Sequence, residues 1–223
     1  MRTVIGEILP LAVVVTVSPV NIVAAILLLF TKRPLLNASC YLAGFLVGVA
    51  AVLGILTAVA GAAHLDTDSQ RSRGVSGLLL ALGLGLIVVA VRKFRSRPAA
   101  GETPPSPKWM DGITAFGPGK SLAAGLTVGA VNPKNIAVGL ASAVTIASAG
   151  LAVGQSIGVI AVYTVFASLG VAAPIVAVLV LGDRSDKVLR GWQAWLDHNN
   201  TAMMSVIYLV FGVILLGRGI GGI

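Results

Sequence analysis

Charged residues are scarce in this chain. Only 11% of its 223 residues are charged, whereas 57% are hydrophobic, and the mean hydropathy is +0.96. A soluble domain of this length would need far more charge to cover its surface. The composition therefore excludes a soluble globular protein and predicts an all-α integral membrane protein.

Cysteine and the usual catalytic motifs are also missing. The single Cys40 excludes an internal disulfide and a two-cysteine redox relay within one chain. We find no glycine-rich phosphate loop and no catalytic triad pattern, which argues against ATP hydrolysis and enzymatic activity. His64, Asp66 and Asp68 cluster without a further ligand at metal spacing, so they predict a solvated loop. We expect no catalytic residue, metal or cofactor.

Long uncharged runs occupy most of the chain instead. There are 24 residues between Glu7 and Lys32, and 48 residues across Asn135–Gly182. A helix crosses a bilayer with about 20 residues. These runs predict six transmembrane helices, at roughly 5–30, 36–63, 74–92, 121–148, 152–181 and 200–218.

The basic residues fall mainly in alternate connections between these predicted helices. One side of the membrane would carry eleven Lys and Arg residues and the other four. The positive-inside rule then predicts a multi-pass plasma-membrane protein with both termini outside. The net charge of +8 is explained by cytoplasmic loops and anionic lipid, so we expect no nucleic-acid partner.

Two segments differ in composition from the predicted membrane helices. Residues 93–120 are basic and proline-rich, which predicts a flexible cytoplasmic linker between two units, 1–92 and 121–223. Asp183–Asn199 places Trp192 and Trp195 on one helical face. This pattern predicts a short amphipathic helix at the membrane interface, before the sixth transmembrane helix.

A hexapeptide is repeated near the start of each unit. Val-Ser-Pro-Val-Asn-Ile at Val17–Ile22 returns as Val-Asn-Pro-Lys-Asn-Ile at Val131–Ile136, with the prolines 114 residues apart. Each unit holds three predicted helices, an odd number, so the two units would form an inverted repeat. Proline removes a backbone donor, so helices 1 and 4 should be broken. Such breaks are tolerated at bilayer depth only where they are buried in protein or line a cavity.

The polar residues of the two copies are the candidate transport site. Pro19 and Pro133 should free the carbonyls of Val15 and Gly129, respectively. Lys134 is the only charged residue deep within a predicted helix, where an ammonium costs roughly 2.5–3.5 kcal/mol, so it should face a cavity or a partner. The residues we assign to substrate binding or transport are Ser18, Pro19, Asn21, Asn132, Pro133, Lys134 and Asn135.

Two alternatives stay open at this point. The asparagines could instead cap the half-helices, with Lys134 bonding the freed carbonyls, so that both breaks are only held together. Glu7 is either a proton-carrying partner for coupling or an acidic residue at the outer interface.

The motifs resemble those of the lysine exporter (LysE) superfamily, whose members carry Ser-Pro-Gly-Pro in the first helix and Asn-Pro-Lys in the fourth. Val20-Asn21 replaces Gly-Pro here, which departs from the amino-acid exporters. The chain is most similar to the actinobacterial glycopeptidolipid- and sulfolipid-addressing (GAP/Sap) family. That resemblance implies a role in moving a large cell-envelope glycolipid outward, alongside other export machinery.

These observations predict a transport protein for a cell-envelope glycolipid of the glycopeptidolipid or sulfolipid type. Its partners would be a membrane lipid or glycolipid substrate and a larger lipid-export machinery, and a homodimer stays open. The alternatives are export of a small solute or cation, or a scaffold of a lipid-export complex that does not itself transport.

Overall fold

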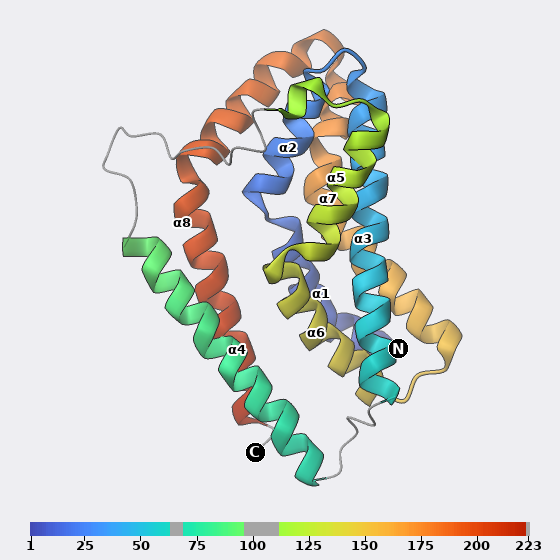
Figure 1. Ribbon diagram of the computed structural model, residues 1–223, viewed down its shortest axis with the longest axis vertical. Coiled ribbons are helices and arrows are strands. Elements are labelled where there is room, and N and C mark those ends of the chain that lie inside the picture. Colours follow the sequence, from blue (N-terminus) through green and yellow to red (C-terminus); the bar gives the residue numbers. More distant parts are fainter. Residues whose placement is uncertain (63–68, 96–111, 222–223) are drawn as a thin grey trace.

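The computed structural model describes residues 1–62, 69–95 and 112–221, and within these ranges all regular structure is helical (Figure 1). The elements are α1 (Arg2–Thr16), α2 (Pro19–Leu29), α3 (Pro34–Ala62), α4 (Ser69–Arg95), η1 (Ile113–Ala115), α5 (Pro118–Val131), α6 (Pro133–Ser148), α7 (Val153–Leu181), η2 (Gly182–Arg184) and α8 (Ser185–Ile220). The proline-rich part of the predicted linker, 96–111, and the cluster at 64–68 lie outside the described residues.

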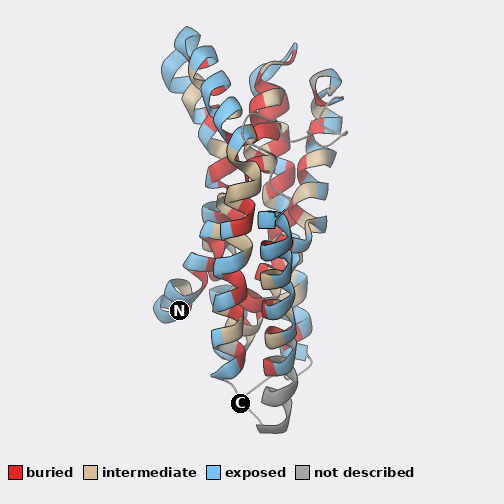
Figure 2. Cartoon of the chain, turned by 90° about the vertical axis from the view of Figure 1, so that its left-hand side faces the viewer, coloured by how far each residue is buried: buried red, intermediate tan, exposed pale blue. Residues whose placement is uncertain are grey.

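The outer surface of the bundle is apolar. Ile55, Leu179 and Val180 are 63–75% exposed, while the middle of the bundle is buried (Figure 2). Large apolar side chains exposed to this extent favour aggregation in water but are expected in lipid. Among the described residues, Pro34–Ala62 and Val153–Gly217 are long and apolar enough to cross a membrane, and α1 with α2 adds a third candidate if counted as one bent helix.

A glycine seam joins α3 to α5. A Cβ atom built on Gly44 or Gly125 would collide with the backbone of the facing helix, at Leu122 and Tyr41 respectively. Gly48 and Gly129 repeat the arrangement one turn further along. Small residues four apart let two helix backbones approach closely, and here they do so on both partners. The seam makes α3 and α5 parallel neighbours that begin at the same end of the molecule.

A second close pair consists of α4 and α8, which stand beside the other helices (Figure 1). Gly83 and Gly212 face each other, because a Cβ on either would lie 2.8 Å from the carbonyl oxygen of the other. Gly182, at φ 53°, provides the left-handed residue that ends α7 and lets the chain turn towards α8.

The predicted amphipathic helix is not a separate element. Asp183 and Arg184 lie in η2, and from Ser185 onward the segment forms the first turns of α8, a continuous helix of 36 residues. Leu189 and Leu196 on its apolar face are buried, whereas Trp192 and Trp195 remain 41% and 58% exposed. Neither proline nor glycine separates the segment from the predicted sixth transmembrane helix, so the helix continues through Asn199 and Asn200.

Candidate transport site at the two helix breaks

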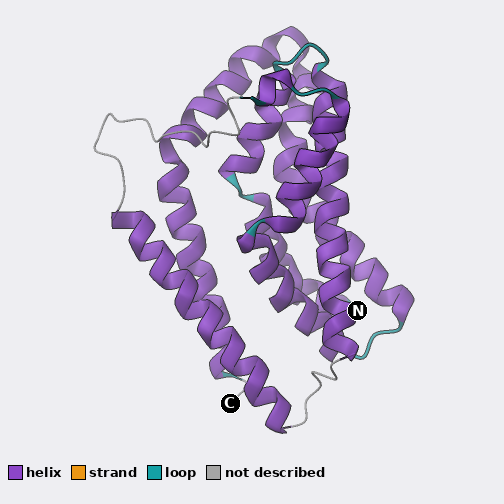
Figure 3. Ribbon diagram, in the orientation of Figure 1, coloured by secondary structure: helices purple, strands orange, loops and turns teal. Residues whose placement is uncertain are grey.

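Both repeated motifs interrupt a helix, as the prolines predict. α1 ends at Thr16, and α2 starts at Pro19 with a bend of 55° between them. α5 ends at Val131, and α6 starts at Pro133. Each proline is the first residue of its second half-helix, where its missing N–H costs nothing. The two interruptions lie near the middle of the bundle (Figure 3).

The first break releases a backbone carbonyl that Lys134 then binds. The Ser18 N–H donates to the Thr16 carbonyl at 3.0 Å, so it no longer serves the carbonyl of Val14. Lys134 Nζ donates to this Val14 oxygen at 2.9 Å. Unwinding therefore begins one residue earlier than Pro19 alone suggests, and the released carbonyl that is bound belongs to Val14 rather than Val15.

Burial makes this contact the central one. The Lys134 side chain is only 3% exposed. A buried cation needs hydrogen-bond acceptors to offset its desolvation. Because its acceptor is 120 residues away on α1, the lysine couples the second break directly to the first.

Two asparagines satisfy the second break. Asn132 Oδ1 accepts a hydrogen bond from the Lys134 backbone N–H at 3.0 Å and so caps α6. Asn135 Nδ2 donates to the carbonyls of Val128 and Gly129 at 3.2 and 3.3 Å. If the asparagines only hold the breaks together, these are the bonds that we expect. The Gly129 carbonyl is also the group that Pro133 was expected to free.

The centre is closely packed in this conformation. A cavity of about 10 Å³ lies among Val15, Gly129, Asn135, Tyr163 and neighbouring apolar residues of α3 and α6. That volume holds about one water molecule. The sequence predicted that the breaks are buried in protein or line a cavity, and a cavity large enough for a substrate would require the two breaks to separate.

Asn21 has unmet hydrogen-bonding capacity beside the first break. It is 1% exposed, and neither Nδ2 nor Oδ1 has a hydrogen-bond partner among the described residues. Asn135 Oδ1 is likewise without one. A buried polar group left unpaired costs roughly 1–3 kcal/mol, so such groups call for an explanation. Here Asn21 lies in the first turn of α2 and Asn135 in the first turn of α6, each directly after a break.

Some residues that hold the first break in place lie outside the repeated hexapeptide. Thr16 Oγ1 donates to the Phe166 carbonyl of α7 at 2.5 Å. Gly170 of α7 packs directly on the Thr16 carbonyl, leaving no room for a Cβ. The position of Thr16, one residue before the motif, was the available hint, whereas the α7 residues depend on tertiary packing.

The remaining predicted residues are less closely connected. Ser18 is buried at the N-cap of α2, without a capping bond from its side chain. Glu7 is exposed on α1, seven residues or ~10 Å along the helix before Val14. Within the described ranges no group of three His, Cys, Asp or Glu residues could hold a metal ion.

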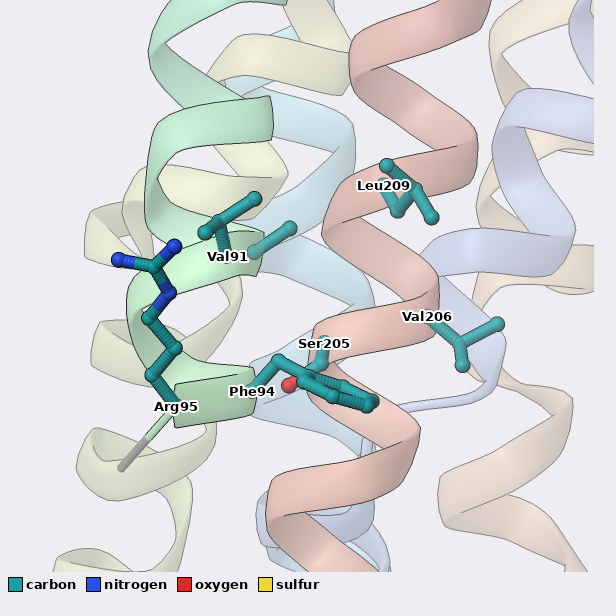
Figure 4. Close-up of a pocket in the computed structure, with 7 residues that line it drawn as sticks. Val91, Phe94, Arg95, Ser205, Val206 and Leu209 are labelled. Atoms are coloured by element: carbon teal, nitrogen blue, oxygen red, sulfur yellow. The ribbon is translucent and has the colours of Figure 1, made fainter. Parts of the chain in front are cut away.

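A separate apolar pocket of about 190 Å³ lies between the end of α4 and the middle of α8. Val91 and Phe94 line it from α4, and Val206 and Leu209 line it from α8 (Figure 4). The Arg95 guanidinium extends away from this apolar lining (Figure 4). The pocket contains none of the repeated-motif residues and so does not belong to the candidate site.

Comparison with known proteins identifies the chain at the level of a family. Neither the curated proteins nor the solved structures include a match to it. The family model described as Sap, sulfolipid-1-addressing protein, matches residues 8–221, nearly the whole chain, and the protein therefore belongs to this family.

Proposed function

We propose that the protein is a plasma-membrane transporter that exports a cell-envelope glycolipid or addresses it to the cell surface. The observation that carries this proposal is the bond from the buried Lys134 ammonium to the Val14 carbonyl, which joins two broken helices at the middle of the bundle. Broken helices facing each other at such a depth are a common arrangement of transporter binding sites. The family name, sulfolipid-1-addressing protein, supports an anionic glycolipid as the substrate.

The proposed architecture is an inverted repeat of two units, with α1–α4 in one and α5–α8 in the other. It is supported by the matched prolines at the starts of α2 and α6, and by the equal lengths of α3 and α7, 29 residues each. Six membrane crossings follow if α1 with α2, and α5 with α6, each count as one. The distribution of basic residues among the loops supports an orientation with both termini outside.

In the proposed mechanism, the substrate replaces the contacts that close the centre. A sulfate or other anionic headgroup would attract the Lys134 ammonium away from the Val14 carbonyl. Sugar hydroxyls would pair with Asn21 and with the free oxygen of Asn135, which lack partners in the closed form. Parting of the two breaks would then expose the site to one side of the membrane or to the lipid.

A deletion strain tests the function. We expect loss of glycolipid from the cell surface and its accumulation inside, both restored by the wild-type gene. Unchanged surface glycolipid would refute the proposal. Rescue by a variant with a scrambled 96–111 segment would argue against a scaffold role, and uptake of a labelled amino acid or cation into liposomes by the purified protein would favour a small-solute exporter.

Replacing Asn21 with leucine separates substrate binding from a structural role. Leucine has the same branched shape and needs no hydrogen bond, but it is larger. In Asn21→Leu the gain from removing two unpaired polar atoms should therefore offset the overpacking and leave the free energy of unfolding within roughly 1 kcal/mol of the wild-type value. Surface glycolipid should fall several-fold, because the substrate loses its amide partner. Both quantities can be measured in one strain, by lipid extraction and by thermal melting of the purified protein.

Asn135→Leu is the matched comparison, since it removes the donor to the carbonyls of Val128 and Gly129. That variant should lose stability as well as transport. If Asn21→Leu were equally destabilised, Asn21 would be a structural residue and its assignment to the substrate would be wrong.

A further inference from the structure

A pocket of about 460 Å³ lies at one end of the bundle, separated from the two helix breaks by the lengths of α2 and α5. It is lined by Lys32, Arg33 and Asn37 on one side and by residues 115–118 on the other. Both cationic side chains are exposed. The pocket thus lies between the turn that connects α2 to α3 and the segment that leads into α5.

Two helix N-termini meet at this pocket. The glycine seam makes α3 and α5 parallel, so they begin side by side at the same end, near the top of Figure 1. Each helix has proline as its first residue and no acidic residue in its first turn. Gly117, the N-cap of α5, has no side chain to cap the free N–H groups. Two adjacent positive helix ends therefore lack the negative charge that usually complements them.

Asn37 is the buried polar group of the pocket, at 2% exposure. Its Nδ2 donates to Thr31 Oγ1 at 2.8 Å and to the Phe116 carbonyl at 2.9 Å. The bond to a carbonyl fixes the amide orientation, because only a donor can make it. Its Oδ1, by contrast, has no partner in the described part of the chain and can only accept a hydrogen bond.

We propose that this pocket binds an anionic headgroup that carries hydroxyls, namely a phosphate or sulfate ester of a polyol. The negative group would lie at the two helix N-termini between Lys32 and Arg33, and a hydroxyl would donate to Asn37 Oδ1. Helix N-termini with basic side chains are suited to such esters. The site is distinct from the helix breaks, so the proposed transport function stands or falls independently of it.

Phosphatidylglycerol is a suitable probe, because it combines a phosphodiester with two hydroxyls. Binding to the purified full-length protein can be measured by native mass spectrometry, with phosphatidylcholine as the neutral comparison. The double variant Lys32→Ala/Arg33→Ala should weaken phosphatidylglycerol binding roughly ten-fold or more. The matched variant Arg184→Ala/Lys187→Ala, which removes two exposed basic residues outside the pocket, should weaken it by less than about two-fold.

Phosphatidylethanol tests the role of Asn37, because it keeps the phosphodiester and lacks the hydroxyls. We expect it to bind the wild type several-fold more weakly than phosphatidylglycerol. Equal losses in the two double variants would overturn the proposal, since diffuse surface charge would then explain binding. Equal affinity for phosphatidylglycerol and phosphatidylcholine would overturn it as well.

The source of the anion is distinguished by competition. Inorganic phosphate at millimolar concentration should displace phosphatidylglycerol only if the pocket binds the free anion. Retention of the lipid in excess phosphate supports a lipid headgroup as the ligand. Either result can be assigned to this pocket only if the Lys32→Ala/Arg33→Ala variant has lost phosphatidylglycerol binding. If that variant still binds the lipid, the pocket is not the site.

Discussion

Replacing Lys134 with methionine is expected to reduce delivery of the glycolipid to the cell surface roughly ten- to a hundred-fold while leaving the protein folded in the membrane. Methionine is unbranched like lysine and can occupy similar space, but it cannot donate to the Val14 carbonyl or attract an anionic headgroup. A hydrogen bond to a charged group contributes about 1.5–3 kcal/mol. Loss of one such bond to the headgroup corresponds to a decrease in transport of roughly ten- to a hundred-fold.

The stability of the Lys134→Met variant should increase slightly or change very little. Leaving the Val14 carbonyl unpaired costs roughly 1–3 kcal/mol. Removing a buried ammonium saves a comparable amount, about 2.5–3.5 kcal/mol on insertion scales. The variant protein should therefore reach the membrane at wild-type levels, which immunoblotting of membrane fractions would verify.

Lys187→Met serves as the control, because Lys187 is exposed on α8 and its substitution changes the net charge by the same amount. It should deliver glycolipid normally. If Lys134→Met also did so at normal protein levels, the lysine would only hold the two breaks together. That outcome would remove the central support of the proposed mechanism and would leave the family relationship intact.

The repeated motif predicted the breaks, since proline removes a backbone donor. Pro19 and Pro133 each start a new half-helix, whereas Pro10 and Pro174 lie inside α1 and α7, so proline alone does not mark a break. Pro133 was also expected to free the Gly129 carbonyl, which Asn135 binds. The partner of Lys134 was harder to predict. Its acceptor depends on how far α1 unwinds, which the Ser18 to Thr16 bond determines and proline alone does not.

Contacts from α7 could not be predicted from the motifs. Phe166 contributes only a backbone carbonyl, and Gly170 contributes only the absence of a Cβ atom, so neither leaves a chemical pattern in the sequence. The amphipathic segment shows a different limitation. A change of composition at Asp183–Asn199 predicted a separate element, but a helix ends where its backbone is interrupted, and none of these residues interrupts it.

The largest effect on folding is expected at the glycine seam between α3 and α5. In Gly125→Ala the new methyl group would collide with the Tyr41 carbonyl, which belongs to backbone and cannot rotate away. The two helices would have to separate along the seam. Overpacking typically costs about 1–3 kcal/mol, and we expect the upper end of that range or more because backbone must shift.

Gly54→Ala is the matched control, since this glycine lies within α3 with nothing within 4 Å of an added Cβ. Alanine is the better helix former by about 1 kcal/mol, so this variant should unfold at higher denaturant concentration than the wild type. Gly125→Ala should unfold at lower concentration, which circular dichroism during titration with sodium dodecyl sulfate would measure. The same substitution should thus shift stability in opposite directions at the two positions. If both variants were stabilised, α3 and α5 would not be in backbone contact, and the parallel pair whose N-termini form the proposed anion-binding pocket would not exist.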